Sequence, residues 1–351
     1  MSETVEIGLK QWENSSSDEL GFTSPDVTRK TTRFINDKGQ QFNVVDVDAR
    51  NGQPGPTVLT SMSFDFRAQP LYEARMATIG TQLQARVISS EIPGITINLD
   101  DPDHTRGDFQ TPHQTAMALF GDFDPLAEEQ FKAMYEVGEL SDDDEYQFLG
   151  GSLGAYSVVA MARAMANGKL FGKNFNVTRM DLIEPVNAYG NYTILRQGKI
   201  LYNLATTEDQ RRQVYLAENA ARGYGDSGKA FEKISPYTLK QDKYVKGRQV
   251  LATYATGIGL RKGLHAALED ALERAPDLRG TDIALYRAKD STVSFEADLQ
   301  SASQTIRDNG GQAEAFTLVG EVGDATPIGH HVLDSHDRNA SFARALQLRA
   351  T

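Results

Sequence analysis

One serine of this 351-residue sequence stands where its neighbours could make its hydroxyl a nucleophile. Ser152 is the centre of Gly150-Gly-Ser-Leu-Gly154, a Gly-x-Ser-x-Gly pattern. The apolar run before it is typical of a strand, and the alanine-rich stretch after it is typical of a helix. Glycines are needed beside the serine, because larger side chains would collide where strand and helix cross. The hydroxyl then projects freely near the positive end of the helix.

A serine hydroxyl is a weak nucleophile at neutral pH, so this chemistry requires a histidine base and a carboxylate that orients it. In enzymes built around such a turn the chain order is serine, acid, histidine, which excludes the two histidines that precede Ser152. His330 follows a predicted strand at 313–319 and comes directly after Gly329, so we expect it to be the base. His331 is the alternative base.

The acid should follow the strand before that one. Residues 281–288 form a short apolar run of strand type, and Asp290 comes two residues later, so we expect Asp290 to be the acid. The same aspartate could instead cap the next helix, which is a common role for an aspartate in a turn. Glu296, Asp181 and Glu184 are weaker alternatives for the acid.

The serine turn, the strand-end acid and the strand-end histidine together resemble the α/β-hydrolase family, and the resemblance covers approximately residues 30–350. Its most specific part is the turn at Ser152. It implies an α/β fold with a mostly parallel, twisted sheet flanked by helices, and with the catalytic loops at the carboxyl ends of the strands. The turn would then be a nucleophile elbow, and the three residues a catalytic triad.

The same resemblance implies an oxyanion hole, which holds the negative charge that develops on the substrate carbonyl. One donor would be the backbone N–H of Leu153. The second would come from the loop after an earlier strand, from Met62 or Ser63. The sequence there, Ser61-Met-Ser-Phe-Asp65, departs from the His-Gly-Gly-Gly pattern of many lipases and esterases.

Three regions follow from this assignment. Residues 1–28 are polar and predict a loose N-terminal arm, while 29–186 and 279–351 form the hydrolase core. Residues 187–278 are charged and mostly helical in pattern, and the resemblance implies a helical cap, or lid, over the active site. A surface elaboration for packing or for oligomer contacts is the alternative.

Composition sets broad limits. The chain has no cysteines, so disulfides and cysteine-based metal sites are excluded. The net charge of −12 argues against nucleic acid as a partner. No run has the length of a membrane span, and the N-terminus lacks the apolar core of a signal peptide. The cytoplasm is therefore the default location, with an oligomer or a larger particle left open. Asp100-Asp-Pro-Asp-His104 lacks a second ligand cluster, so we expect no metal site.

The expected function is that of a serine hydrolase that cleaves a carboxylic ester, or a related acyl bond, through an acyl-enzyme intermediate. The substrate would be a small or acylated molecule, and the chemistry requires no cofactor. Amides, thioesters, acyl transfer to an alcohol and perhydrolase-type activity use the same residues. The alternative of a different class is a hydrolase-fold protein that serves as a binding or structural assembly component, with a vestigial or occluded site.

Overall fold

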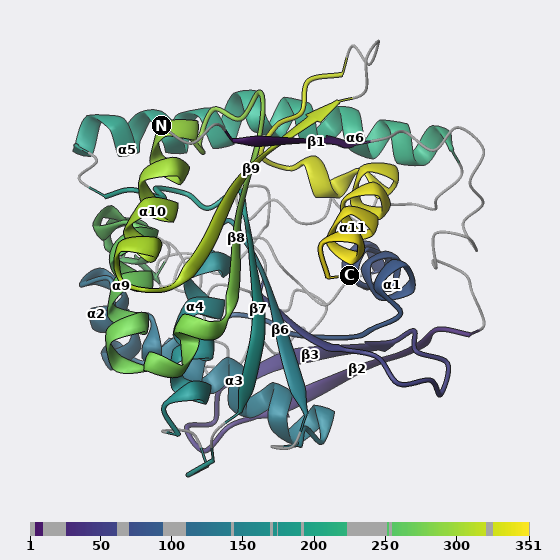
Figure 1. Cartoon of the computed structure of the whole chain (residues 1–351), viewed down its shortest axis with the longest axis vertical. Coiled ribbons are helices and arrows are strands. Elements are labelled where there is room, and N and C mark those ends of the chain that lie inside the picture. Colours follow the sequence, from purple (N-terminus) through teal and green to yellow (C-terminus); the bar gives the residue numbers. More distant parts are fainter. Residues whose placement is uncertain are drawn as a thin grey trace.

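The structure is a computed structural model that describes residues 4–9, 26–61, 70–93, 110–141, 144–168, 171–173, 175–190, 193–222, 251–252, 255–320 and 326–350 (Figure 1). Its centre is a nine-stranded sheet with the order β1-β9-β8-β7-β6-β4-β5-β3-β2. The strands are β1 (Val5–Leu9), β2 (Thr28–Ile35), β3 (Gln41–Asp48), β4 (Thr57–Ser61), β5 (Arg86–Ser90), β6 (Glu145–Gly151), β7 (Asn176–Ile183), β8 (Asp282–Ala288) and β9 (Gln312–Gly320). Strand β3 pairs antiparallel with β2 and β5, and the other neighbours pair in parallel.

Helices cover both faces of the sheet (Figure 1). They are α1 (Pro70–Leu83), α2 (Pro112–Leu119), α3 (Asp124–Gly138), α4 (Gly154–Ala166), α5 (Ile194–Asn203), α6 (Asp209–Ala221), α9 (Leu264–Arg274), α10 (Glu296–Asp308) and α11 (His336–Ala350). Short helical turns lie at η2 (Leu204–Glu208), η3 (Leu260–Lys262), η4 (Pro276–Gly280) and η5 (Val332–Asp334). Helix α1 packs against α11, whereas α4 packs against α3 and α9. Among the helices of the described residues, none is long and apolar enough to cross a membrane.

The core is centred on β6 and α4. Successive side chains of a strand point to opposite faces, so Phe148 belongs to the apolar cluster under α3 and α4, while Leu149 belongs to the cluster under α1 and α11. Every residue of α4 is buried. Its glycine and alanines let the helix lie close against β6 and β7, which it contacts. The turn that carries Ser152 is therefore held between a largely buried strand and a fully buried helix.

The fold class expected from the sequence is confirmed. The sheet is mostly parallel and is flanked by helices, and the strands expected near 281–288 and 313–319 are β8 and β9. Parallel strands buried on both faces read as continuous apolar runs, which is why these segments are recognisable in the sequence.

The expectation of a loose arm over 1–28 is wrong for residues 5–9. This segment forms β1, which pairs in parallel with β9 from Val5 opposite Phe316 to Leu9 opposite Gly320. Leu9 is fully buried, and Ile7 packs against the same apolar cluster. The alternation of Val5, Ile7 and Leu9 with Glu6 and Gly8 is the period-two pattern of an edge strand.

The described residues of the region expected to form a cap include two helical parts. Helix α9 packs against α4 and α10, and its buried leucines belong to the main apolar cluster, so it is part of the helical layer on that face. Helix α5, the π-helical turn η2 and α6 follow one another without a break, and we call residues 194–221 the cap segment. Figure 1 shows it stretched along one end of the molecule. It contacts the loops that follow β8 and β9.

Candidate active site

Ser152 lies in the turn between β6 and α4, with a left-handed backbone at φ 55°. A residue other than glycine in this region is strained, and the surrounding contacts hold it there. The Ser152 N–H donates to the carbonyl oxygen of Ile183, 2.9 Å away. Gly150 allows the close crossing, because a Cβ there would stand 2.7 Å from Cα of Ala155 and 2.5 Å from a methyl of Val158. The sequence thus encodes a strained turn that projects the serine side chain.

His330 lies in the loop that follows β9, of which residues 326–331 are described, and we call these residues the base loop. Its Nε2 is 3.0 Å from Oγ of Ser152. Serine and histidine are each 7% exposed, so the contact is sheltered from water. The structure therefore brings together the serine and the histidine that the sequence indicates, 178 residues apart in the chain.

The carboxylate beside the histidine belongs to Glu184, which directly follows β7 and is 1% exposed. Its Oε2 is 2.9 Å from Nδ1 of His330 and accepts a 2.6 Å hydrogen bond from Oγ of Ser291. Its Oε1 accepts a hydrogen bond from the N–H of Ala288. Glu184 also has a left-handed backbone, with φ 50°. Ser152 and Glu184 thus both lie in turns directly after a strand, and both have a left-handed backbone.

The expectation that Asp290 is the acid is not met in the structure. Its Oδ2 accepts a 2.9 Å hydrogen bond from the N–H of Ile328, and its own N–H donates to the Ile328 carbonyl oxygen over 2.9 Å. Sheet register explains the difference. Gly151 pairs with Ile183, and Ile183 pairs with Tyr286, so Glu184 follows β7 at the level of the serine turn. Asp290 lies two residues after the end of β8 and four residues beyond Tyr286, and it meets the backbone of the base loop instead.

The other acid candidates lie elsewhere. Asp181 is buried within β7, where its carboxylate contacts the side chains of Arg179 and Arg349. Burial raises the pKa of Asp181, and the neighbouring arginines act in the opposite direction. Glu296 begins α10 and stands 3.5 Å from the guanidinium of Arg287. Both carboxylates serve ion pairs away from the histidine.

His331, the alternative base, points into a different cluster. Its Nδ1 is 3.6 Å from Oδ2 of Asp334, which also pairs with Arg75 and, at 2.8 Å, with Arg212. Burial lowers the pKa of His331 well below its usual 6.5, and Arg212, His330 and Arg75 lower it further. The ring of His331 meets that of His330 edge to face, with centroids 5.0 Å apart. The geometry of the described residues therefore favours His330 over His331 as the partner of the serine.

Of the expected oxyanion-hole residues, Leu153 is described and Met62 and Ser63 lie outside the described residues. Leu153 is buried and directly precedes α4, so its N–H lies at the positive end of that helix. Asp100 to His104 also lie outside the described residues. Within the part of the chain that the structure describes, no group of three histidine or acidic side chains could hold a metal ion.

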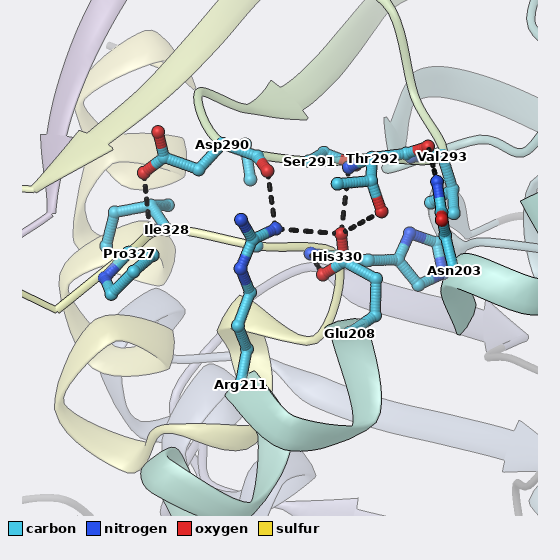
Figure 2. A network of polar contacts seen from close by, with 12 residues as sticks. Asn203, Glu208, Arg211, Asp290, Ser291, Thr292, Val293, Pro327, Ile328 and His330 are labelled. Carbon is cyan, nitrogen blue, oxygen red and sulfur yellow. Dashed lines mark hydrogen bonds and ion pairs between the residues drawn. The ribbon is translucent and has the colours of Figure 1, made fainter. Parts of the chain in front are cut away.

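A residue that the sequence did not indicate borders the base loop. Glu208, the last residue of η2, has a fully buried side chain. Figure 2 shows it between the loop after β8 and the base loop, and its Oε2 accepts a 2.8 Å hydrogen bond from the N–H of His330. In the sequence it is one of several acidic residues in a charged helical stretch, and nothing there distinguishes it from a solvated one.

The comparisons with known proteins concern structure, because the sequence matches no protein-family model and no curated protein. A thioesterase domain from the curacin biosynthetic pathway is 15% identical, with a TM-score of 0.52, and the match covers 92% of this chain and 99% of that one. The 2-hydroxy-6-oxo-6-phenylhexa-2,4-dienoate hydrolase of Rhodococcus sp. strain RHA1 is 12% identical, with a TM-score of 0.56 and the same coverage. An esterase B from Lactobacillus rhamnosis is 12% identical, with a TM-score of 0.51, over 93% and 86% of the two chains.

These likenesses extend over nearly the whole chain, whose mostly parallel sheet is flanked by helices. The protein therefore has the α/β-hydrolase fold. Because the identities are low, they establish the fold alone, and the chemistry has to be argued from the site.

Proposed function

We propose that the protein is a serine hydrolase that cleaves a carboxylic ester or a related acyl bond, with Ser152 as nucleophile, His330 as base and Glu184 as the acid that orients the base. The observation that carries this proposal is the continuous line of contacts from Ser152 Oγ through both nitrogens of His330 to the Glu184 carboxylate. Nucleophile, base and orienting acid are each within hydrogen-bond reach of the next, as this chemistry requires.

In the first half of the reaction, Nε2 of His330 accepts the hydroxyl proton as Oγ of Ser152 forms a bond to the acyl carbon. The carbonyl π electrons move to the oxygen, where the N–H of Leu153 would donate a hydrogen bond. Glu184 accepts a hydrogen bond from Nδ1–H and stabilises the imidazolium. Collapse of the intermediate breaks the bond to the leaving alcohol, which takes the proton from Nε2 and leaves an acyl-enzyme.

In the second half, water attacks the acyl carbon and gives its proton to Nε2. The bond to Oγ then breaks, Oγ regains the proton, and the carboxylic acid leaves. An ester is the substrate class that we favour, because an esterase and a thioesterase are among the structural neighbours and an alcohol is an easier leaving group than an amine.

Turnover of p-nitrophenyl esters with acyl chains of increasing length tests this function. Wild type should release p-nitrophenol, and Ser152→Ala and His330→Ala should each lower kcat by about 10⁴-fold or more. The chain length at which kcat/KM is highest would measure the acyl pocket. Hydrolysis that persists at the wild-type rate in Ser152→Ala would contradict the proposal.

The second candidate is a binding or assembly protein with an occluded site, and the burial of Ser152 favours it. In that case a well-folded wild type would hydrolyse none of the esters. The intact line of contacts favours the enzyme, since a site without selection for chemistry has no need to keep Glu184, His330 and Ser152 in hydrogen-bond reach.

A further inference from the structure

Glu208 stands at the junction of three chain segments. It ends the π-helical turn η2, and such turns rotate the residues that follow relative to a regular α-helix and occur frequently at functional sites. Its Oε1 accepts hydrogen bonds from the N–H of Thr292 at 2.8 Å and from Oγ1 of Thr292 at 2.7 Å. Its Oε2 accepts from the N–H of His330 at 2.8 Å. The cap segment thus contacts the backbone at the catalytic base through one carboxylate (Figure 2).

The two loops around the base are each held by two buried carboxylates. Glu184, from the core, contacts the side chain of His330 and accepts a hydrogen bond from the hydroxyl of Ser291 in the loop after β8. Glu208, from the cap segment, contacts the backbone N–H of His330 and that of Thr292. The imidazole is therefore oriented from the core, while the backbone that carries it is fixed from the cap segment.

Other contacts of the cap segment converge on the same backbone. Nη1 of Arg211 is 2.9 Å from Oε1 of Glu208 and also donates to the carbonyl oxygen of Asp290. The hydroxyl of Tyr215 accepts a 2.9 Å hydrogen bond from the N–H of Gly329 and donates to the carbonyl oxygen of Pro327. The positive charge of Arg211 compensates the buried carboxylate, which would otherwise be costly to remove from water.

The close approach depends on the absence of a side chain at Gly329. A Cβ at this position would stand 2.5 Å from Oε2 of Glu208 and 2.6 Å from Cδ of Arg211. Gly329 thus has a role besides its place in the loop after β9. Because it has no side chain, Glu208 of the cap segment can approach the backbone N–H of His330.

We propose that Glu208 is a positioning residue that couples the cap segment to the catalytic base, so that His330 lies within reach of Ser152 when the cap segment is docked. Movement of the cap segment would remove the acceptor for the N–H of His330 and release the base loop. The cap segment would then regulate the catalytic line through its contacts with the base loop. The part of this inference that concerns catalysis rests on the proposed hydrolase function.

The test compares Glu208→Gln with Asp209→Asn in the full chain. Glutamine keeps the size of the side chain but replaces one acceptor oxygen by a donor, which must then face an N–H of His330 or of Thr292. Asp209 is exposed and is the next residue in the same cap segment, so its amide variant removes an equal charge without touching the base loop. Amide hydrogen exchange of peptides that span 288–295 and 326–334 is measured together with kcat and KM on p-nitrophenyl esters.

We expect exchange in both peptides to become at least tenfold faster in Glu208→Gln and to stay at the wild-type rate in Asp209→Asn. We expect kcat of Glu208→Gln to fall at least tenfold while KM changes by less than threefold, because the base is displaced and the acyl pocket is not. Thr292→Val, which removes one donor to Glu208, should show the same exchange effect in the 288–295 peptide at a smaller size.

Unchanged exchange and a kcat within twofold of wild type in Glu208→Gln would overturn the inference and leave the hydrolase function intact. Faster exchange in a protein whose wild type hydrolyses no ester would support the link between Glu208 and the base loop and contradict the hydrolase function. Loss of kcat with a proportional rise in KM and unchanged exchange would also overturn it, since the effect would then lie in substrate binding.

Discussion

At the scale of single residues, the site depends on which of two carboxylates follows its strand at the level of the serine. Glu184 follows β7 at that level and contacts His330. Asp290 follows β8 and contacts the backbone of Ile328 instead. Both are acidic residues in the loop after a strand, and the register between neighbouring parallel strands cannot be read from the sequence. The position of His330 after a strand and a glycine favoured it over His331 as the base, whereas nothing in the sequence favoured Glu184 over Asp290 as the acid.

This assignment predicts opposite results for two amide variants. Glu184→Gln keeps the shape of the side chain but weakens the hydrogen bond that orients His330, and we expect kcat on an ester to fall by about 10³ to 10⁴-fold. Asp290→Asn keeps an oxygen that can accept from the N–H of Ile328, and its kcat should stay within about threefold of wild type. Steady-state kinetics of the two variants decide between the acids. A larger fall of kcat in Asp290→Asn than in Glu184→Gln would indicate that Asp290 is the acid.

At the scale of elements, a feature could be predicted from the sequence when it depends on residues that are close together in the chain. Buried parallel strands and the serine turn are encoded in consecutive residues, and they were predicted. Strand β1 was missed because five residues of alternating pattern are a weak signal within a polar stretch. The role of Glu208 was missed because its partner His330 is 122 residues away, and only the packed structure brings them together.

The contact between the cap segment and the base loop predicts the behaviour of two glycine variants. Gly329→Ala would place a methyl group 2.5 Å from Oε2 of Glu208 and 2.6 Å from Cδ of Arg211, so that these side chains or the base loop have to shift. Overpacking of this kind costs about 1–3 kcal/mol of the free energy of unfolding, and we expect kcat to fall at least tenfold as His330 moves.

Gly198→Ala is the matched control for this prediction. Gly198 lies on α5 with nothing within 4 Å of its Cβ position, so alanine should raise helix stability by about 0.5–1 kcal/mol. Denaturant unfolding and ester turnover of both variants give the comparison. Equal stability and equal kcat for the two variants would contradict the tight contact at Gly329.

At the scale of the whole molecule, buried histidines link stability to pH. Burial lowers the pKa of His336 to about 3 and that of His331 well below 6.5. The unfolded chain therefore binds protons at these sites from about pH 6.5 downward, and the folded protein does not. The stability that this linkage represents is present above pH 6.5 and is lost as the pH falls below it.

A histidine that is protonated in the unfolded chain but not in the folded protein lowers the free energy of unfolding by up to about 1.4 kcal/mol per pH unit as the pH falls below its unfolded pKa. His336→Asn removes one such histidine, so its slope should be smaller than that of wild type by up to about 1.4 kcal/mol per pH unit. Denaturant unfolding at several pH values between 4.5 and 7.5 measures both slopes, and the comparison holds whatever the absolute stability of the variant. Parallel slopes would show that His336 is accessible to protons in the folded state.

The most direct test of the central claim is covalent labelling by a fluorophosphonate probe, read by mass spectrometry of the peptide that contains Ser152. Wild type should gain one adduct at Ser152, His330→Ala should gain it far more slowly, and Ser152→Ala should gain none at this peptide. A folded wild type that stays unlabelled, or an adduct at a different residue, would contradict the assignment of Ser152 as an activated nucleophile.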